Sequence, residues 1–291
     1  MILITGATGN IGNELTKILS ASSTPARAFV RNGLQSKAIA LPGIEIVEGD
    51  FSEPETFATA LAGVDCLFLL IPSSSRVEEQ QRNFVDEAKR SKVKRIVKLS
   101  QLGADENAAG RFQRYHGAVE KHIVKSGIGY TFLRPNLFMQ GLLNFRQTIS
   151  SRGEFYAPAG DAAVSVVDVR DIASVGTRVL TEAAHEGKIY DITGPEALTH
   201  EEMARQLSQA IAKTIQYVNV PPEAMRQALL NLGMPEWQAE GLVEDYAHYR
   251  RGEAAGVSST VHDITGKAVI PFSQFVREYA GKFLEKATSA P

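Results

Sequence analysis

The chain opens with Met1–Gly12, whose sequence is MILITGATGNIG. Met1–Thr5 is mainly apolar and is predicted as a strand, and apolar residues from Ile11 onward recur at helical spacing. The glycines therefore lie in a turn between a strand and a helix. Such glycines allow a tight turn, close approach of backbone N–H groups to a pyrophosphate, and close packing of helix against strand. A purely structural turn is the alternative. We expect the cofactor contacts of this turn to come from Gly6, Thr8, Gly9, Asn10, Ile11 and Gly12.

The end of the second predicted strand bears on the choice of cofactor. About 20 residues beyond the glycines, an acidic residue usually binds the ribose hydroxyl of NAD. No Asp or Glu occurs between Pro25 and Ile44, and the strand ends at Arg31. A guanidinium group binds phosphate oxygens through two hydrogen bonds, which suits the 2′-phosphate. NADP(H) is therefore favoured over NAD(H), with a solvated surface charge as the alternative role for Arg31.

The remaining cofactor contacts are predicted at the carboxyl ends of later strands, where ligands of open α/β sheets bind. Asp50 either accepts a hydrogen bond from the adenine amino group or only ends its strand as a turn residue. The other residues predicted to border the cofactor are Phe51, Ile71, Pro72, Ser100 and Pro135.

Short apolar runs alternate with amphipathic stretches through the first half of the chain, which predicts a parallel sheet covered on both faces. The second half has fewer strands and longer helices, one of which opens with a capping box at Thr199–Glu202. The sequence predicts an α/β protein: a Rossmann-like doubly wound parallel sheet over residues 1–150, followed by a smaller, mostly helical substrate-binding region over residues 151–291. Strands at 165–167 and 188–192 are expected to rejoin the first domain.

Composition narrows the classes of function. Of the 291 residues, 44% are hydrophobic and 22% are charged, as in a globular protein, and the net charge of −2 gives no basic excess for nucleic acid. The single cysteine, Cys66, cannot form an internal disulfide and lies in an apolar run, where a buried thiol is expected. No stretch approaches the length of a membrane span, and no metal-ligand spacing is present. We expect a cytoplasmic protein, either a monomer or a homodimer, that acts on a small molecule.

These motifs, together with the run Tyr130–Asn136 and the segment His116–Glu120, resemble the NmrA-like branch of the atypical short-chain dehydrogenase/reductases. Within that branch the chain is most similar to NADPH-dependent quinone reductases and triphenylmethane-dye reductases. The resemblance covers nearly the whole chain. It implies a reductase that transfers a hydride to a quinone-like or other conjugated apolar acceptor, or a non-catalytic NADP(H) sensor. A sugar-nucleotide epimerase is disfavoured, because its catalytic base is missing.

Short-chain dehydrogenases usually place Tyr and Lys four residues apart on one helix, beside a Ser. Ser100 and Tyr115 occupy the expected places, but the residue four positions after the tyrosine is Val119. Tyr115 lies on an apolar helix face, so it is either catalytic or a core residue. His116 and Glu120 share a helix face, so they form either an oriented proton donor or a surface pair.

The segment after Pro135 is expected to meet the nicotinamide end of the cofactor. Apolar residues there and further along either line a pocket for the acceptor or belong to the ordinary core. The pocket residues that we predict are Asn136, Phe138, Met139, Phe155 and Tyr156.

Overall fold

The structure is a computed structural model that describes residues 1–32 and 37–285. The chain divides into two compact units. Unit 1 comprises Met1–Pro135, Val169–Ile192 and Thr260–Gly266. Unit 2 comprises Asn136–Asp168, Thr193–Ser259 and the chain from Lys267 onward. The chain thus passes between the units several times.

Unit 1 is built on a seven-stranded sheet in the order β3-β2-β1-β4-β5-β6-β9. Every neighbouring pair is parallel. The chain first adds β2 and β3 on one side of β1 and then continues with β4 on the other side. This reversal is the topological switch point of a doubly wound sheet. The predicted Rossmann-like fold is confirmed. The strands are β1 (Ile2–Ile4), β2 (Ala26–Val30), β3 (Ile44–Glu48), β4 (Cys66–Leu69), β5 (Arg95–Leu99), β6 (Gly129–Pro135) and β9 (Lys188–Ile192).

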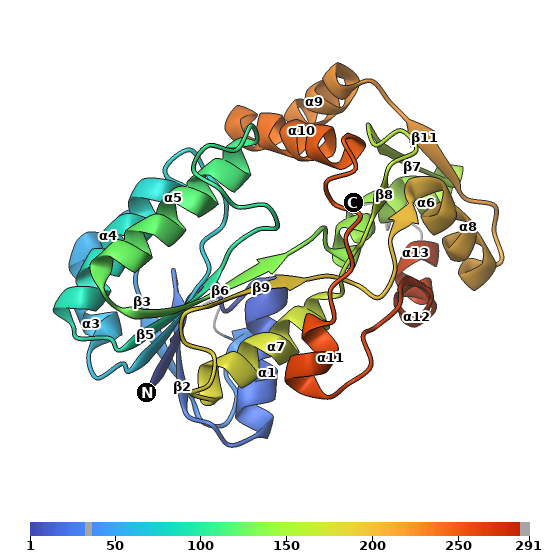
Figure 1. The fold of residues 1–291 in the computed structure, drawn as a ribbon. Coiled ribbons are helices and arrows are strands. Elements are labelled where there is room, and N and C mark those ends of the chain that lie inside the picture. Colours follow the sequence, from blue (N-terminus) through green and yellow to red (C-terminus); the bar gives the residue numbers. More distant parts are fainter. Residues whose placement is uncertain (33–36, 286–291) are drawn as a thin grey trace. The chain divides into compact units, whose positions relative to one another are not determined.

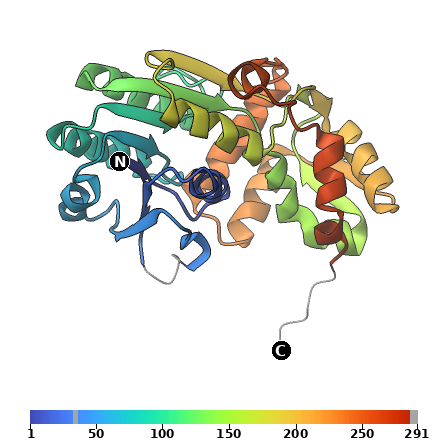
Figure 2. The same cartoon turned by 90° about the horizontal axis from the view of Figure 1, so that it is seen from below.

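Helices cover both faces of this sheet. On one face α1 and α7 lie side by side, with α11 against α7 (Figures 1 and 2). On the other face α4 packs between α3 and α5 (Figure 1). The α-helices of unit 1 are α1 (Asn10–Ala21), α3 (Phe57–Leu61), α4 (Val77–Arg90), α5 (Arg111–Ser126), α7 (Val169–Thr181) and α11 (Thr260–Thr265), and two short 3₁₀ helices are η1 (Lys37–Ile39) and η2 (Pro54–Thr56).

The core of unit 1 follows from its strands. The four residues of β4 are all buried, as expected for a central parallel strand covered on both faces. Burial raises the pKa of the Cys66 thiol, which agrees with an inert cysteine. Phe84 of α4 forms an aromatic cluster with Phe29 and Phe57. The ring of Phe57 lies edge-on at 4.7 Å from that of Phe84, and the ring of Phe29 is tilted at 5.6 Å.

Unit 2 combines helices with two small sheets. β8 (Ala163–Val164) pairs antiparallel with β10 (Leu198–Thr199), and β7 (Glu154–Ala157) pairs parallel with β11 (Gln216–Asn219). The expected capping box is present at the start of α8. The helices are η3 (Met139–Phe145), α6 (Arg146–Arg152), α8 (His200–Ile211), α9 (Pro222–Asn231), α10 (Glu236–Arg250), α12 (Phe272–Glu278) and α13 (Ala280–Leu284).

The two late strands of the sequence prediction have different positions. Lys188–Ile192 is β9, at the edge of the sheet of unit 1. Residues 165–167 form no strand there. The neighbouring β8 belongs to unit 2, and Ser165 is fixed instead by hydrogen bonds to the chain around Ala254. A side chain that pairs with loop backbone gives no period-two pattern, so this arrangement is not visible in the sequence.

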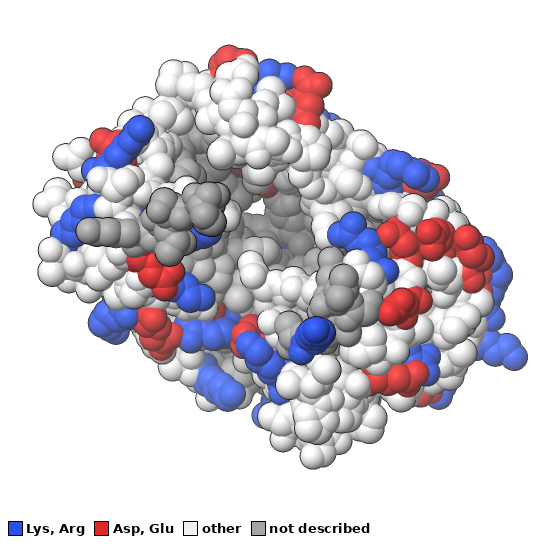
Figure 3. Space-filling model, turned by 180° about the vertical axis from the view of Figure 1, so that it is seen from behind, with Lys and Arg blue, Asp and Glu red and all other residues white. Residues whose placement is uncertain are grey.

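Charges of both signs occur on the protein surface (Figure 3). On the face drawn in Figure 3, Lys and Arg side chains are interspersed with Asp and Glu. Among residues 1–32 and 37–285, no helix has both the length and the apolar character needed to cross a membrane.

Candidate active site

The glycine turn between β1 and α1 forms a tight cradle. Gly6 has a φ of +64°, in the left-handed region that favours glycine. A Cβ atom on Gly12 would lie 2.2 Å from the carbonyl oxygen of Gly6. Gly9 donates its N–H to that same oxygen at 3.0 Å and serves as the N-cap of α1. The first and third glycines are therefore required by the geometry of the turn.

Two polar residues beside the turn bear on whether it suits a dinucleotide. Thr5 accepts a hydrogen bond from the N–H of Leu70 at 2.8 Å, which joins the ends of β1 and β4. Asn13, in the first turn of α1, has a buried Oδ1 atom without a hydrogen-bond partner among the described residues. The start of α1 also carries N–H groups that have no intrahelical acceptor. These features fit a pyrophosphate at the helix N-terminus and a ligand hydroxyl beside Asn13.

The residues predicted to contact the adenosine half have distinct surroundings. Arg31 is exposed at the end of β2. Asp50 accepts hydrogen bonds from the N–H and the hydroxyl of Ser52 at 2.7 and 2.6 Å, and these bonds, with a contribution from Arg31, hold its pKa below the usual range. Both bonds use one oxygen of the Asp50 carboxylate, so the turn role is present and the adenine contact stays a prediction. Phe51 packs against Phe29 and Phe84, at 5.1 Å from each ring.

The other residues predicted near the cofactor lie where strands of unit 1 end. Ile71 is buried and Pro72 is exposed just beyond β4. Ser100 donates its N–H to Leu133 at 2.7 Å just after β5, and Pro135 ends β6. The predicted set is thus distributed along the carboxyl edge of one sheet, where the fold binds ligands.

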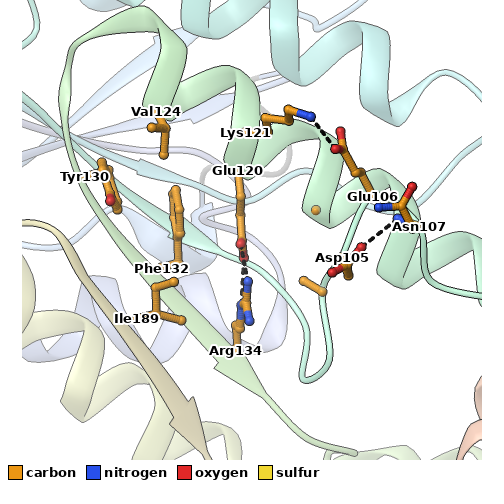
Figure 4. A pocket seen from close by; sticks show the side chains of 12 residues that line it. Asp105, Glu106, Asn107, Glu120, Lys121, Val124, Tyr130, Phe132, Arg134 and Ile189 are labelled. Carbon is orange, nitrogen blue, oxygen red and sulfur yellow. Dashed lines mark hydrogen bonds and ion pairs between the residues drawn. The ribbon is translucent and has the colours of Figure 1, made fainter.

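A buried polar network lies between the sheet and α5. The hydroxyl of Ser100 donates to Glu120 at 2.5 Å, and Arg134 of β6 donates to both oxygens of the same carboxylate. Figure 4 shows Glu120 and Arg134 pointing toward each other from α5 and β6. The side chain of Glu120 is only 7% exposed, so the carboxylate depends on these two donors for its solvation.

A second part of this network joins β5 to α5. The Nζ atom of Lys98 lies 2.7 Å from Nδ1 of His116 and 3.1 Å from the carbonyl oxygen of Leu99. Burial lowers the pKa of Lys98 to about 7, against the opposing effect of Glu120. Burial, and then the charges of Lys98 and Arg134, hold the pKa of His116 well below its usual value. His116 is therefore a neutral imidazole, and while Lys98 is an ammonium group its Nδ1 is the acceptor of this hydrogen bond.

This arrangement corrects the expected His116–Glu120 pair. The hydrogen-bond partners of Glu120 are Ser100 and Arg134, and that of His116 is Lys98. Neither a donor dyad nor a surface pair is formed, because the carboxylate turns toward the sheet. Sequence reasoning missed Lys98. The available signal was a lysine within a buried parallel strand, where a charge is rare unless it has a partner.

Tyr115 is 4% exposed, as expected for a core residue, and its ring packs on that of His116 at 4.1 Å. Its hydroxyl nevertheless lies 2.9 Å from the hydroxyl of Ser73, in the loop after β4. Tyr115 is therefore a buried residue whose hydroxyl group is hydrogen-bonded to another polar side chain.

Unit 2 contains a cavity of about 450 Å³, a size typical of small-molecule sites. Four of the five predicted pocket residues line it: Phe138, Met139, Phe155 and Tyr156. The fifth, Asn136, is 5% exposed and donates to Ser165 and to the carbonyl oxygen of Ala254, so its amide stabilises the loop. Further lining residues that the sequence did not identify include Met203, Met225, His200, Asp245 and Tyr246.

The sequence matches the NmrA-like family over residues 1–275. It is 36% identical to an NAD(P)H azoreductase of Xenophilus azovorans, covering 97% of this chain and 99% of the relative.

Two solved structures are similar over almost the whole chain. The first is an NADPH-dependent quinone oxidoreductase from Escherichia coli complexed with NADPH, with a TM-score of 0.87 and 30% identity over 96% of this chain and 99% of that chain. The second is a triphenylmethane reductase from Citrobacter sp. complexed with NADP(H), with a TM-score of 0.85 and 29% identity over 96% of this chain and 100% of that chain. The family resemblance of the sequence is thereby confirmed, and the chain belongs to the NmrA-like family.

Proposed function

We propose that this chain is an NADPH-dependent reductase that delivers a hydride to a flat, conjugated apolar acceptor of the quinone-like class. The observation that carries the proposal is the cavity of unit 2, whose size and mainly apolar lining suit a flat conjugated molecule. Relatives named as an NAD(P)H azoreductase and an NADPH-dependent quinone oxidoreductase support the same class of reaction.

In this proposal the carboxyl edge of unit 1 holds the nicotinamide cofactor. The backbone of the glycine turn and the N-terminus of α1 bind the pyrophosphate, and Arg31 binds the 2′-phosphate. The bound cofactor supplies the hydride. The protein contributes orientation and exclusion of water, so the missing Tyr–Lys pair does not prevent reduction of an acceptor that is already electron-poor.

Hydride addition to a quinone-like acceptor leaves an oxyanion that must gain a proton. The Lys98–His116 pair is suited to supply it. The ammonium group of Lys98 can pass a proton to Nδ1 of His116 while Nε2 releases one, which leaves a neutral amine and a neutral imidazole. Lys98 would act through His116 and is thus a positioning residue. Because its pKa is about 7, Lys98 still carries this proton in part of the molecules at neutral pH.

The cavity of unit 2 would hold the acceptor. Its aromatic side chains offer faces for stacking, while its methionines adapt to ring systems of different outline. Such a lining favours flat apolar molecules and gives little selectivity among them.

The direct test is oxidation of NADPH by the purified protein in the presence of quinones, azo dyes and triphenylmethane dyes, with NADH in parallel. We expect turnover with NADPH and with quinone-like acceptors. Tight binding of NADPH by calorimetry, without oxidation by any member of the panel, would contradict the proposal and favour a sensor.

A further inference from the structure

We infer that His200 selects the acceptors that enter the cavity of unit 2, favouring flat conjugated molecules that carry a carbonyl or hydroxyl oxygen. This inference rests on the proposed function, because it concerns the acceptor pocket of the same reductase. His200 lines the cavity and is 4% exposed. A polar side chain at such a position needs a physical account, since the rest of the lining is mainly apolar.

The position of His200 is fixed by the helix that it begins. Thr199 and Glu202 form the capping box of α8: the N–H of Glu202 donates to Oγ1 of Thr199 at 3.2 Å, and the N–H of Thr199 donates to the Glu202 carboxylate at 2.9 Å. These bonds determine the course of the first turn of α8. His200 therefore enters the cavity wall from a rigid element rather than from a loop.

Aromatic rings surround the imidazole. Its centroid lies 5.1 Å from that of Tyr217, 5.8 Å from that of Tyr246 and 6.3 Å from that of Phe155. Two of these neighbours, Phe155 and Tyr246, line the cavity themselves. The imidazole is thus held in one orientation by packing, which is the condition for a precise contact with a ligand.

The imidazole has unused hydrogen-bonding capacity. Neither ring nitrogen has a hydrogen-bond partner among the described residues. Nδ1 is closed off even from water, whereas Nε2 is not, so Nε2 is the atom that a ligand in the cavity can reach. Polar groups in buried positions are normally paired, and a ligand oxygen would supply the partner that Nε2 lacks.

The chemistry of that oxygen follows from the protonation state. Burial lowers the pKa of His200 to about 4, so the ring is neutral near pH 7. A neutral imidazole offers one N–H donor and one acceptor, so it can pair with a carbonyl or with a hydroxyl. The neighbouring phenol of Tyr246 is also neutral, because burial raises its pKa above the usual range.

One residue argues for a different ligand. Asp245 lines the same cavity and is 7% exposed. A carboxylate there would favour a cationic dye, so triphenylmethane cations are the competing class of acceptor. His200 and Tyr246 are both neutral, and Asp245 is the single acid among the described lining residues. We therefore assign the uncharged, oxygen-bearing class of acceptor.

The experiment compares two azo acceptors that share one frame and differ by a single ring hydroxyl. Each is assayed by NADPH oxidation with the wild type, His200→Leu, His200→Gln and Met203→Leu. The glutamine amide reaches the position of Nε2 of histidine, whereas leucine removes the polar group. Met203→Leu is the matched control, because it changes the same cavity without changing its polarity.

For His200→Leu we expect kcat/KM with the hydroxylated dye to fall about tenfold, with little change for the other dye. His200→Gln should retain most of the preference, and Met203→Leu should affect both dyes alike. Equal losses for both dyes in His200→Leu would overturn the inference while the reductase stands. A cationic triphenylmethane dye turned over faster than either azo dye, with no effect of His200→Leu, would overturn it as well.

Binding without chemistry separates this inference from the proposed function. Calorimetry of the full chain with naphthol and with naphthalene measures the hydroxyl preference in the absence of NADPH. A preference for naphthol that His200→Leu removes would support ligand selection by His200, even if no acceptor were reduced and the reductase proposal failed. Identical affinities for the two ligands in the wild type would overturn the inference directly.

Discussion

The Nζ atom of Lys98 lies 2.7 Å from Nδ1 of His116, although the two side chains come from β5 and α5. Lys98 is fully buried. An ammonium group is poorly solvated at such a position, so the lysine releases its proton near neutral pH instead of near pH 10. The pair therefore holds a proton that is available in the range where most enzymes work.

The first prediction concerns the pH dependence of turnover. The pKa of Lys98 is lowered to about 7, so its proton is present below that pH and is lost above it. If the product anion takes this proton, kcat at saturating NADPH should fall as pH rises through about 7. Lys98→Met should remove this dependence and lower kcat in the acidic range. A profile unchanged by Lys98→Met, in a variant that still binds NADPH, would contradict the role.

A second prediction concerns the stability given by the buried carboxylate. Arg134→Met leaves Glu120 without its charged partner, and this should reduce the free energy of unfolding by about 3 kcal/mol. The double variant Arg134→Met with Glu120→Gln should recover part of the loss. Lys121→Met is the control, because the exposed Lys121–Glu106 pair should contribute less than about 1 kcal/mol. Chemical denaturation measures all three, and equal effects of the two single substitutions would contradict the burial argument.

The glycine turn gives a third prediction. Gly12→Ala would place a Cβ atom 2.2 Å from the carbonyl oxygen of Gly6, so α1 and the turn must separate. NADPH affinity should fall by at least about tenfold, and the protein should be less stable. Gly281→Ala, in α13, is the control because no atom lies within 4 Å of its added Cβ. Calorimetry with NADPH would count against the cradle if both variants bound equally well.

Cofactor choice is tested at Arg31. Arg31→Ala should raise the KM for NADPH about tenfold and leave the KM for NADH nearly unchanged, because only NADPH carries the 2′-phosphate. Lys17→Ala removes one exposed positive charge from α1 and controls for the general field. The same loss for both cofactors would exclude Arg31 as the ligand of the 2′-phosphate.

The last prediction is the acid sensitivity that His200 confers. Its pKa is about 4 in the folded chain and 6.5 in the unfolded chain, so the unfolded state binds the proton more readily. Stability contributed by this group is present above pH 6.5 and is lost as pH falls toward 4. Between pH 7 and 5 the loss amounts to about 2 kcal/mol.

His200→Phe should unfold with a smaller dependence on pH over this range, as measured by denaturation at the two pH values. His262→Phe, at a site whose side chain is 69% exposed, should show the wild-type dependence. A wild-type dependence in His200→Phe would mean that the imidazole is already protonated or solvated in the folded chain.

The sequence by itself determined the sheet and the cofactor edge. A strand, a glycine turn and a helix are neighbours along the chain, so their signal is local, and alternating strands and helices then impose parallel pairing. The capping box of α8 was equally visible, because its hydrogen bonds join residues three positions apart. Four pocket residues were predicted because they follow β6 or belong to an apolar run.

Only the tertiary structure decided the partners of the polar groups. Glu120 is one turn from His116 along α5, yet it binds Ser100 and Arg134 from two strands. The neutral state of His200 likewise arises from rings contributed by β7, β11 and α10. Protonation and hydrogen bonding depend on burial and on neighbours distant in sequence, and no local pattern encodes which of them meet.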